Sequence, residues 1–363
     1  MRRALSRWSS TSRRPPLVSR FSFRKRPNPA LAFLCRCTYG TTNANSPFLK
    51  TRSSCANDTI SNMKSRTLLA LGLGSLSLMS ALAPLVWAQT EPAATTTETP
   101  AIKNDKIIVL KPSSKSIVGA DVPNDANLFE PVKATRPLKV ALYEGPGSGD
   151  SGVEAVSSRV AMIPGSVVTR LKPEEIGTTD LTPFDFVVFS GGSGSAQAKA
   201  IGDKGLQNVR TYVKNGGGYL GICAGAYLAC SNYPWSLGIL NAKTVQPWLR
   251  GSAALQLELT EEGRTTFGDV KKPFFVRYHN GPVIQPDNKP DLPPYKVEAW
   301  FRTEAVREGN KQGLMVDTPA VVSGIYGKGR VLTISPHPED SRGLENFVPH
   351  AMVWLSDKTP VAK

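Results

Sequence analysis

The residues with the clearest capacity for chemistry form the pentapeptide Gly221-Ile222-Cys223-Ala224-Gly225. The apolar segment 219–222 leads directly into the cysteine, so the pattern predicts a sharp strand-to-helix turn that exposes the thiol above a sheet edge. The N-terminus of the following helix would favour the thiolate, and the Ala224 N–H would face a developing oxyanion. We therefore predict that Cys223 is a nucleophile, with a structural thiol in a glycine-rich turn as the alternative. Cys230 lies too far along the same helix to form a disulfide with it.

A candidate base follows a second apolar segment, 330–334, in the sequence Ser335-Pro336-His337-Pro338-Glu339. Imidazole is the side chain best suited to take a proton from a thiol near pH 7, and the chain has only three histidines. Glu339 is placed to hold the imidazole tautomer and to stabilise the imidazolium. Alone, this segment is better explained as a surface loop. Together with the cysteine turn, it predicts a Cys–His–Glu set.

Two glycine-rich segments, 145–150 and 190–194, follow predicted strands, where backbone N–H groups can approach a substrate carbonyl; simple turns are the alternative. Neither segment fits Gly-x-Gly-x-x-Gly, and 327–330 is not a P-loop, so nucleotide binding is not indicated. No Cys/His spacing predicts a metal site, and we expect no cofactor. His279 is a candidate substrate contact or a plain loop residue, and we assign no role to His350.

These segments require a scaffold that brings several strand ends to one edge of a sheet. Continuous apolar runs predict buried strands, and apolar positions at helical spacing predict helices between them. The alternation predicts an α/β fold with a mostly parallel sheet covered on both faces. Strands are expected at 140–143, 186–189, 219–222, 255–259, 274–278, 297–301, 320–326 and 330–334, and helices at 153–162, 196–214 and 344–355. A hairpin turn is expected at 327–329, between the last two strands.

The formal net charge of +15 over 363 residues is concentrated at one end of the chain. Residues 1–62 hold 12 Lys and Arg against a single acid, whereas 30 basic residues face 28 acidic residues from Gln89 onward. The body is therefore near neutral, and no nucleic-acid-binding face is predicted. With 40 % hydrophobic and 20 % charged residues, the chain is not a wholly disordered one.

Residues 63–88 have the order of a secretory signal peptide. Lys64 and Arg66 precede an apolar run at 67–87, and Val86-Trp87-Ala88 forms a small-x-small cleavage site. We therefore expect an exported protein, periplasmic or secreted. The alternative is a protein anchored in the membrane by an uncleaved segment 67–87.

The rest of the chain divides by composition. We interpret residues 1–62 as a basic leader upstream of the true start at Met63, with an organelle-targeting segment as the alternative. Residues 89–135 are expected to be a linker followed by a segment that wraps the surface, because they are rich in Thr, Pro and Ala and then in polar residues. The folded domain is expected over 136–360.

These segments, in this order, resemble the class I glutamine amidotransferase superfamily, whose triad is Cys–His–Glu, and more closely the N-terminal domain of eukaryotic biotin–protein ligase and its stand-alone bacterial relatives. The resemblance implies a flavodoxin-like α/β/α sandwich. It implies Cys223 as nucleophile, His337 as base and Glu339 as its orienter, with Gly191 or Gly192 and Ala224 lining the oxyanion hole. It spans roughly 137–340 and rests on Tyr143-Glu144-Gly145-Pro146-Gly147, Ser190-Gly191-Gly192, Gly217–Tyr227, Tyr278-His279-Asn280-Gly281 and Gly327-Lys328-Gly329-Arg330.

One position departs from the family pattern. Glutaminases of the superfamily read G-x-C-x-G-x-Q, and their Gln helps to hold the substrate, whereas this chain carries Tyr227 there. The departure argues against glutamine as a substrate and leaves the triad intact. We expect neither synthetase nor biotin-ligase activity.

Two classes of function are therefore predicted. The first is an exported amidotransferase-like cysteine hydrolase that cleaves the amide of a small molecule or peptide. The second is a catalytically silent amidotransferase-fold domain with a binding or accessory role, tethered to a membrane if residues 67–87 are retained. Neither prediction involves a nucleic acid.

Overall fold

The computed structural model of the protein describes residues 107–110, 116–125 and 127–358. The predicted leader (1–62) and signal peptide (63–88) lie outside these residues, as does the linker up to residue 106. None of the helices in the described ranges combines the length and the hydropathy that a membrane span requires.

A nine-stranded sheet forms the centre of the molecule, in the order β3-β2-β4-β5-β13-β12-β10-β7-β8. Its strands are β2 (Lys139–Tyr143), β3 (Val167–Leu171), β4 (Phe186–Phe189), β5 (Gly218–Ile222), β7 (Ser252–Leu259), β8 (Phe274–His279), β10 (Lys296–Phe301), β12 (Pro319–Tyr326) and β13 (Gly329–Ile334).

The sheet changes character at β13. From β3 to β13 each strand pairs in parallel with the next. When these five strands are numbered by their place in the chain, their spatial order is 2-1-3-4-5, which is the arrangement of flavodoxin-like folds. From β13 to β8 each pair is antiparallel. The predicted mostly parallel sheet is thus confirmed for one half and wrong for the other. The tight turn at Gly327-Lys328 reverses the chain between β12 and β13, which makes this pair antiparallel.

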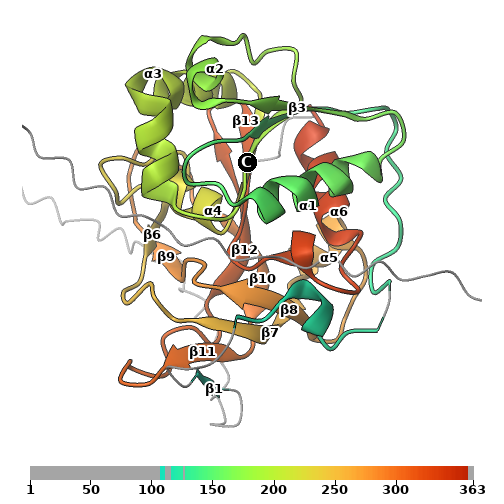
Figure 1. The fold of residues 1–363 in the computed structure, drawn as a ribbon, viewed down its shortest axis with the longest axis vertical. Coiled ribbons are helices and arrows are strands. Elements are labelled where there is room, and N and C mark those ends of the chain that lie inside the picture. The colour runs from blue at the N-terminus through green and yellow to red at the C-terminus, as the bar shows by residue number, and fades with distance from the viewer. Residues whose placement is uncertain (1–106, 111–115, 126, 359–363) are drawn as a thin grey trace, which may run out of the picture. The chain divides into compact units, whose positions relative to one another are not determined.

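Helices cover both faces of the parallel half (Figure 1). Alternate residues of β2 and β4 point to opposite faces, which gives two buried clusters. One cluster joins the sheet to α1, α5 and α6, and the other joins it to α2, α3 and α4. The helices are α1 (Asp150–Ala161), α2 (Pro173–Thr178), α3 (Gly194–Lys214), α4 (Ala224–Ala229), α5 (Glu261–Phe267) and α6 (Phe347–Ser356).

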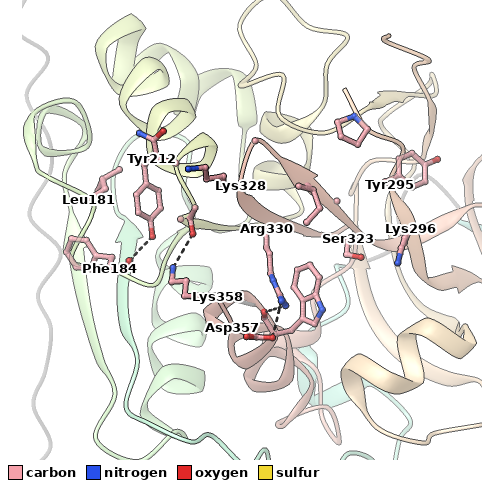
Figure 2. A pocket seen from close by; sticks show the side chains of 18 of the residues that line it. Leu181, Phe184, Tyr212, Tyr295, Lys296, Ser323, Lys328, Arg330, Asp357 and Lys358 are labelled. Carbon is pink, nitrogen blue, oxygen red and sulfur yellow. Dashed lines mark hydrogen bonds and ion pairs between the residues drawn. The ribbon is translucent and has the colours of Figure 1, made fainter. Parts of the chain in front are cut away.

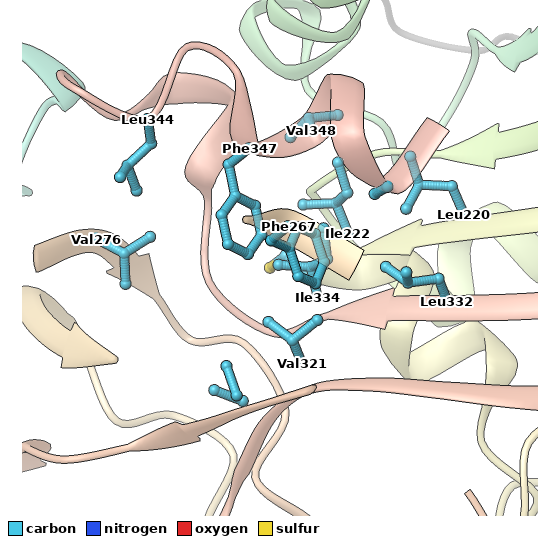
Figure 3. Close-up of a cluster of buried hydrophobic side chains, with 14 of the residues drawn as sticks. Leu220, Ile222, Phe267, Val276, Val321, Leu332, Ile334, Leu344, Phe347 and Val348 are labelled. Atoms are coloured by element: carbon cyan, nitrogen blue, oxygen red, sulfur yellow. The ribbon is translucent and has the colours of Figure 1, made fainter. Parts of the chain in front are cut away.

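The first cluster fixes the two strands that lead to the predicted triad. Leu220 and Ile222 of β5 and Ile334 of β13 pack against α6, where Phe347 stacks on Phe267 with ring centroids 4.2 Å apart (Figure 3). These side chains are fully buried. The ends of β5 and β13 are therefore held by the same core.

The helices differ from those predicted in their bounds and at one interior position. The helix expected from 153 begins at Asp150, immediately after Gly149, and the last helix begins at Phe347, with Leu344 buried in the turn before it. α3 is interrupted at Gly202, whose φ of 60° is readily adopted only by glycine.

Short elements complete the fold. β1 (Ile107–Leu110) pairs in parallel with β11 (Glu304–Arg307), and β6 (Ala242–Thr244) pairs with β9 (Ile284–Pro286). Two 3₁₀ turns, η2 (Gly119–Asp121) and η3 (Pro338–Asp340), lie near each other, because Arg342 N–H donates to the Gly119 carbonyl at 3.1 Å.

Candidate active site

The candidate site lies at the carboxyl ends of neighbouring parallel strands. Ile222 of β5 is in register with Ile334 of β13, and Gly221 is in register with Phe189 of β4. The residues that follow these strand ends therefore meet at one edge. This edge is where ligands bind in open α/β sheets.

Cys223 sits in a strained turn between β5 and α4. Its φ of 51° and ψ of −97° are rare for a residue with a side chain. The Cys223 N–H donates to the Ile334 carbonyl at 2.8 Å, which ties the turn to β13. Both flanking glycines are required sterically, because a Cβ at Gly221 would lie 2.5 Å from the Gly225 oxygen and one at Gly225 would lie 2.1 Å from the Phe189 oxygen.

His337 and Glu339 form a buried pair beside this turn. The Nδ1 atom of His337 lies 2.8 Å from Oε1 of Glu339, and the two residues are 7 % and 2 % exposed. This contact leaves Nε2 of the imidazole for proton exchange. The other carboxylate oxygen of Glu339 has no hydrogen-bond partner among the described residues.

The electrostatics of the pair favour an imidazolium. Burial lowers the pKa of His337, but the charges of Cys223 and Glu339 and hydrogen bonds to both outweigh it and raise that pKa to about 10. In the thiol form, Cys223 Sγ donates to the His279 carbonyl at 3.5 Å.

Gly191 lies in contact with both the imidazole and the cysteine. A Cβ at this position would be 2.6 Å from Cε1 of His337 and 3.7 Å from Cβ of Cys223. Gly192 adopts a φ of 144° and has no room for a Cβ, which would lie 2.0 Å from the Gly147 oxygen. Within the part of the chain that the structure describes, the N–H groups of Gly191, Gly192 and Ala224 make no hydrogen bond. They can therefore serve as donors to an oxyanion.

The loop after β8 forms a second wall of the site. Asn280 has a φ of 51°, which asparagine tolerates better than most residues, and its side chain accepts from Gly251 N–H at 2.7 Å. Tyr227 donates its hydroxyl to the Asn280 carbonyl at 3.2 Å, so it bridges α4 and this loop. Burial raises the pKa of Tyr227, and the phenol therefore stays neutral.

The contacts of the His279 side chain do not support a catalytic role. Its Nδ1 atom lies 3.1 Å from Oγ of Ser116, and burial, with the charges of Arg277 and His337, lowers its pKa. Only its backbone oxygen reaches Cys223. His350 contacts the Glu130 carbonyl at 2.9 Å, away from the triad.

Cys230 lies at the other end of α4 from Cys223. α4 has only six residues, so Cys230 caps its C-terminus and does not lie within a longer helix that also follows Cys223, as the sequence had predicted. Burial raises its pKa to about 12, and its Sγ donates to the Ala226 carbonyl. Both cysteines are free.

Two contributors to the site were not predicted. Gln197 is fully buried, and its Nε2 donates to the Ser190 carbonyl at 2.9 Å and to Ser148 Oγ at 3.2 Å, which joins the two glycine-rich loops. The backbone of Arg277 accepts from His337 N–H at 2.8 Å. No local sequence pattern marks Gln197 as part of a site. The contact of the Arg277 carbonyl is a backbone contact, so it has no sequence pattern either.

A large cavity of about 1690 Å³ lies at the opposite end of the parallel strands (Figure 2). It is lined by residues at the starts of β4, β5 and β13, among them Phe184, Gly217 and Arg330. Arg330 lies over the Trp354 ring, 4.8 Å from its centroid. None of the predicted site residues lines this cavity.

Residues 138–247 match the model of the family described as the N-terminal domain of biotin-protein ligase. The resemblance predicted from the motifs is confirmed for this segment. It contains Cys223 and both glycine-rich loops, and it ends before His337 and Glu339.

None of the curated proteins matches the chain. Among solved structures, the chain is similar to cytoplasmic protein STM1381 from Salmonella typhimurium LT2, with 15 % identity over 61 % of this chain and 100 % of that one, at a TM-score of 0.40. It is also similar to PurLQS from Thermotoga maritima, with 14 % identity, 61 % and 97 % coverage and a TM-score of 0.45. A ThuA-like protein from Parabacteroides merdae gives 13 % identity, 63 % and 93 % coverage and a TM-score of 0.43.

Proposed function

We propose that the protein is an exported cysteine hydrolase that cleaves an amide C–N bond in a small molecule or peptide. The observation that carries this proposal is the buried His337–Glu339 pair at 2.8 Å beside a cysteine in a strained turn. Backbone strain of this kind persists only where surrounding structure maintains it, and it concentrates at functional sites.

The geometry supports a two-step reaction. The Cys223 thiolate attacks the amide carbon, and the oxyanion that forms is held by N–H groups of Ala224 and Gly191 or Gly192. His337 then gives its Nε2 proton to the leaving amine, and the C–N bond breaks to leave a thioester. Water, deprotonated by the now neutral His337, attacks the thioester carbon and releases the carboxylic acid and the thiolate.

Glu339 acts through His337. Its carboxylate holds the Nδ1–H and stabilises the imidazolium in both steps. No step uses a metal or a cofactor. Export is proposed from the predicted signal peptide at residues 63–88, with an uncleaved membrane anchor as the alternative.

A second candidate is a binding or accessory domain without turnover. It is favoured by Tyr227, whose phenol takes the position of the substrate-holding Gln and bridges to the Asn280 carbonyl. Such a domain would keep the pocket for recognition and would not release product.

The deciding experiment is labelling of the protein with an iodoacetamide probe at pH 7, in the presence and absence of a panel of small amides and peptide amides. A hydrolase should label saturably at Cys223, and its substrate should both protect the thiol and be consumed. A binding domain should show protection without consumption. Absence of Cys223 labelling in the folded protein would refute the hydrolase proposal. The Cys223→Ala variant serves as the negative control for labelling.

A further inference from the structure

A segment that precedes the family-matched region borders the candidate site. Residues 116–125, here called the strap, run beside β8. Arg277 Nε of β8 donates to the Ile117 carbonyl at 2.8 Å, and Ile117 N–H donates to Ser252 Oγ at 2.9 Å. Ser116 contacts the His279 ring, as described above.

Asn124 makes the most extensive contacts of the strap. Its Nδ2 donates to the Phe275 carbonyl at 2.6 Å and to the Arg342 carbonyl at 3.0 Å, and its Oδ1 accepts from Phe275 N–H at 2.9 Å. The residue is 8 % exposed. One side chain therefore joins the open edge of β8 to the segment that follows η3.

The proposed triad pair lies immediately before this segment, with His337 at the start of η3 and Glu339 inside it. His337 N–H donates to the Arg277 carbonyl at 2.8 Å, and the His337 carbonyl accepts from Ser341 Oγ at 2.6 Å. Ser341 Oγ in turn accepts from Arg277 N–H at 3.0 Å. The backbone of His337 is thus clamped between β8 and the residue beside Arg342.

Gly119 packs against this segment from the strap side. A Cβ at Gly119 would lie 2.1 Å from the Asp340 oxygen, so the strap backbone touches η3 directly. Beyond the strap, Phe129 anchors the chain in the core, where its ring packs edge-on against Phe274 and Phe347. The contacts of the strap with η3 are therefore held at both ends.

We infer that Asn124 is a positioning residue for the His337–Glu339 pair, and that the strap belongs to the active site. This inference rests on the proposed reactivity of the triad. Removal of the Asn124 side chain would leave two carbonyls and one N–H at the η3–β8 junction without their partner. The segment 338–342 would loosen, and Glu339 would hold the imidazole for a smaller fraction of the time.

The chain offers a closely matched control in Asn241, which is also 8 % exposed. Its Nδ2 donates to the carbonyls of Lys289 and Leu292 at 3.1 and 2.7 Å, and its Oδ1 accepts from Lys289 N–H at 2.9 Å. The hydrogen-bond pattern is the same, but these partners lie outside the triad segment. Asn124→Ala and Asn241→Ala should therefore cost similar stability and differ only in their effect on His337.

The test is an NMR titration of the histidine Hε1 signals in the full chain, with His337 assigned by His337→Gln, together with iodoacetamide labelling of Cys223. Glu339→Gln defines complete loss of the carboxylate contact. Asn124→Ala should move the His337 midpoint down by roughly one pH unit. Because the ring is then held less firmly beside the thiol, labelling at pH 7 should slow about 3–10-fold. Asn241→Ala should leave both unchanged despite a similar fall in Tm.

The outcomes separate the two proposals. If Glu339→Gln changes neither quantity, the proposed triad itself fails. If Glu339→Gln changes both and Asn124→Ala behaves like Asn241→Ala, the role of Asn124 is refuted. Should Asn124→Ala fail to fold, Gly119→Ala replaces it, because its methyl group would displace η3 without removing a polar group. A folded Gly119→Ala protein with an unchanged His337 midpoint would equally refute the role of the strap.

Discussion

The backbone of Gly191 lies so close to the imidazole of His337 that a Cβ there would stand 2.6 Å from Cε1. The loop after β4 therefore forms one side of the space that holds this imidazole ring. This contact explains why a glycine occupies the position, independently of any conformational need.

Gly191→Ala should displace the His337 ring and slow iodoacetamide labelling of Cys223 by about 10–100-fold, because small displacements of a reacting group cost this much. Gly149→Ala is the control, since its Cβ would meet only the Gly191 oxygen at an ordinary 3.8 Å. Labelling rates and Tm of both variants check the prediction. Equal labelling rates in the two variants would contradict it.

Cys223 should react with iodoacetamide at pH 7 at least 100-fold faster than Cys230. Burial raises the pKa of Cys230 to about 12, so its thiolate is scarce at neutral pH, and no imidazolium is paired with it. Mass spectrometry of peptides from a labelling time course would measure both rates. Comparable rates would show that the Cys223 turn does not activate its thiol.

Tyr227 should exclude free glutamine as a good substrate. Its phenol, hydrogen-bonded to the Asn280 carbonyl, takes the place of the Gln carboxamide that glutaminases of the resembled superfamily carry. We expect negligible ammonia release from glutamine by the natural protein. Tyr227→Gln should raise it, and adding Cys223→Ala should abolish the gain. Robust glutaminase turnover with Tyr227 present would overturn this interpretation.

Glu298 should make the fold less stable as pH rises. Burial is the main reason that its pKa is raised, and Oε2 has no hydrogen-bond partner among the described residues. The favourable contribution of Glu298 to the free energy of unfolding is complete below its pKa of 4.5 in the unfolded chain. This contribution is lost as pH rises through the higher pKa of the folded state. Glu298→Gln should therefore raise Tm at pH 8 relative to the natural protein. The rise should be about 2–4 °C for each kcal/mol gained in the free energy of unfolding, and it should shrink toward pH 4.

Asp185 provides a comparison of opposite sign. Burial raises its pKa, but hydrogen bonds from Arg136 and from Lys139 N–H, with the Arg136 charge, outweigh burial and lower it. Its contribution is present above the unfolded value of 3.8 and is lost as pH falls through the folded pKa. Asp185→Asn should lower Tm at pH 8, and the deficit should shrink in acid. Parallel pH trends in the two variants would count against both assignments.

Export should remove the chain up to Ala88. N-terminal sequencing of the protein from its native host should begin near Gln89, because Val86-Trp87-Ala88 precedes it as a cleavage site. A product that retains residues 67–87 would identify that segment as an anchor.

The parallel half of the fold was predictable because its strands are buried on both faces and read as unbroken apolar runs. The strand at 186–189 was located to the residue. β3 was missed because its side chains alternate in exposure at the sheet edge and its run contains Thr169 and Arg170. In the antiparallel half, the individual strands and the hairpin at 327–329 were predicted. The pairing of the other strands was not, because pairing direction depends on connections between distant strands.

At the site, the sequence predicts residues whose type and position after a strand suggest chemistry, but not residues that act only through their place in the fold. Cys223, His337 and Glu339 were named from their positions after strands and from a family resemblance. Asn124 and Gln197 could not be named, because each acts through hydrogen bonds to backbone groups far away in the chain. Such contacts have no signature in a single sequence.

The neighbour relation of β5 and β13 has a consequence for the order of folding. The two strands lie side by side in the sheet, yet about 100 residues of chain separate them. The entropy of closing so long a stretch of chain must be overcome before contacts between such segments can form. Cys223 closes its turn against Ile334, and it meets His337 only when β13 has docked. During synthesis the cysteine emerges first and has no imidazole beside it, so the proposed reactivity of the thiol would arise only as the sheet is completed.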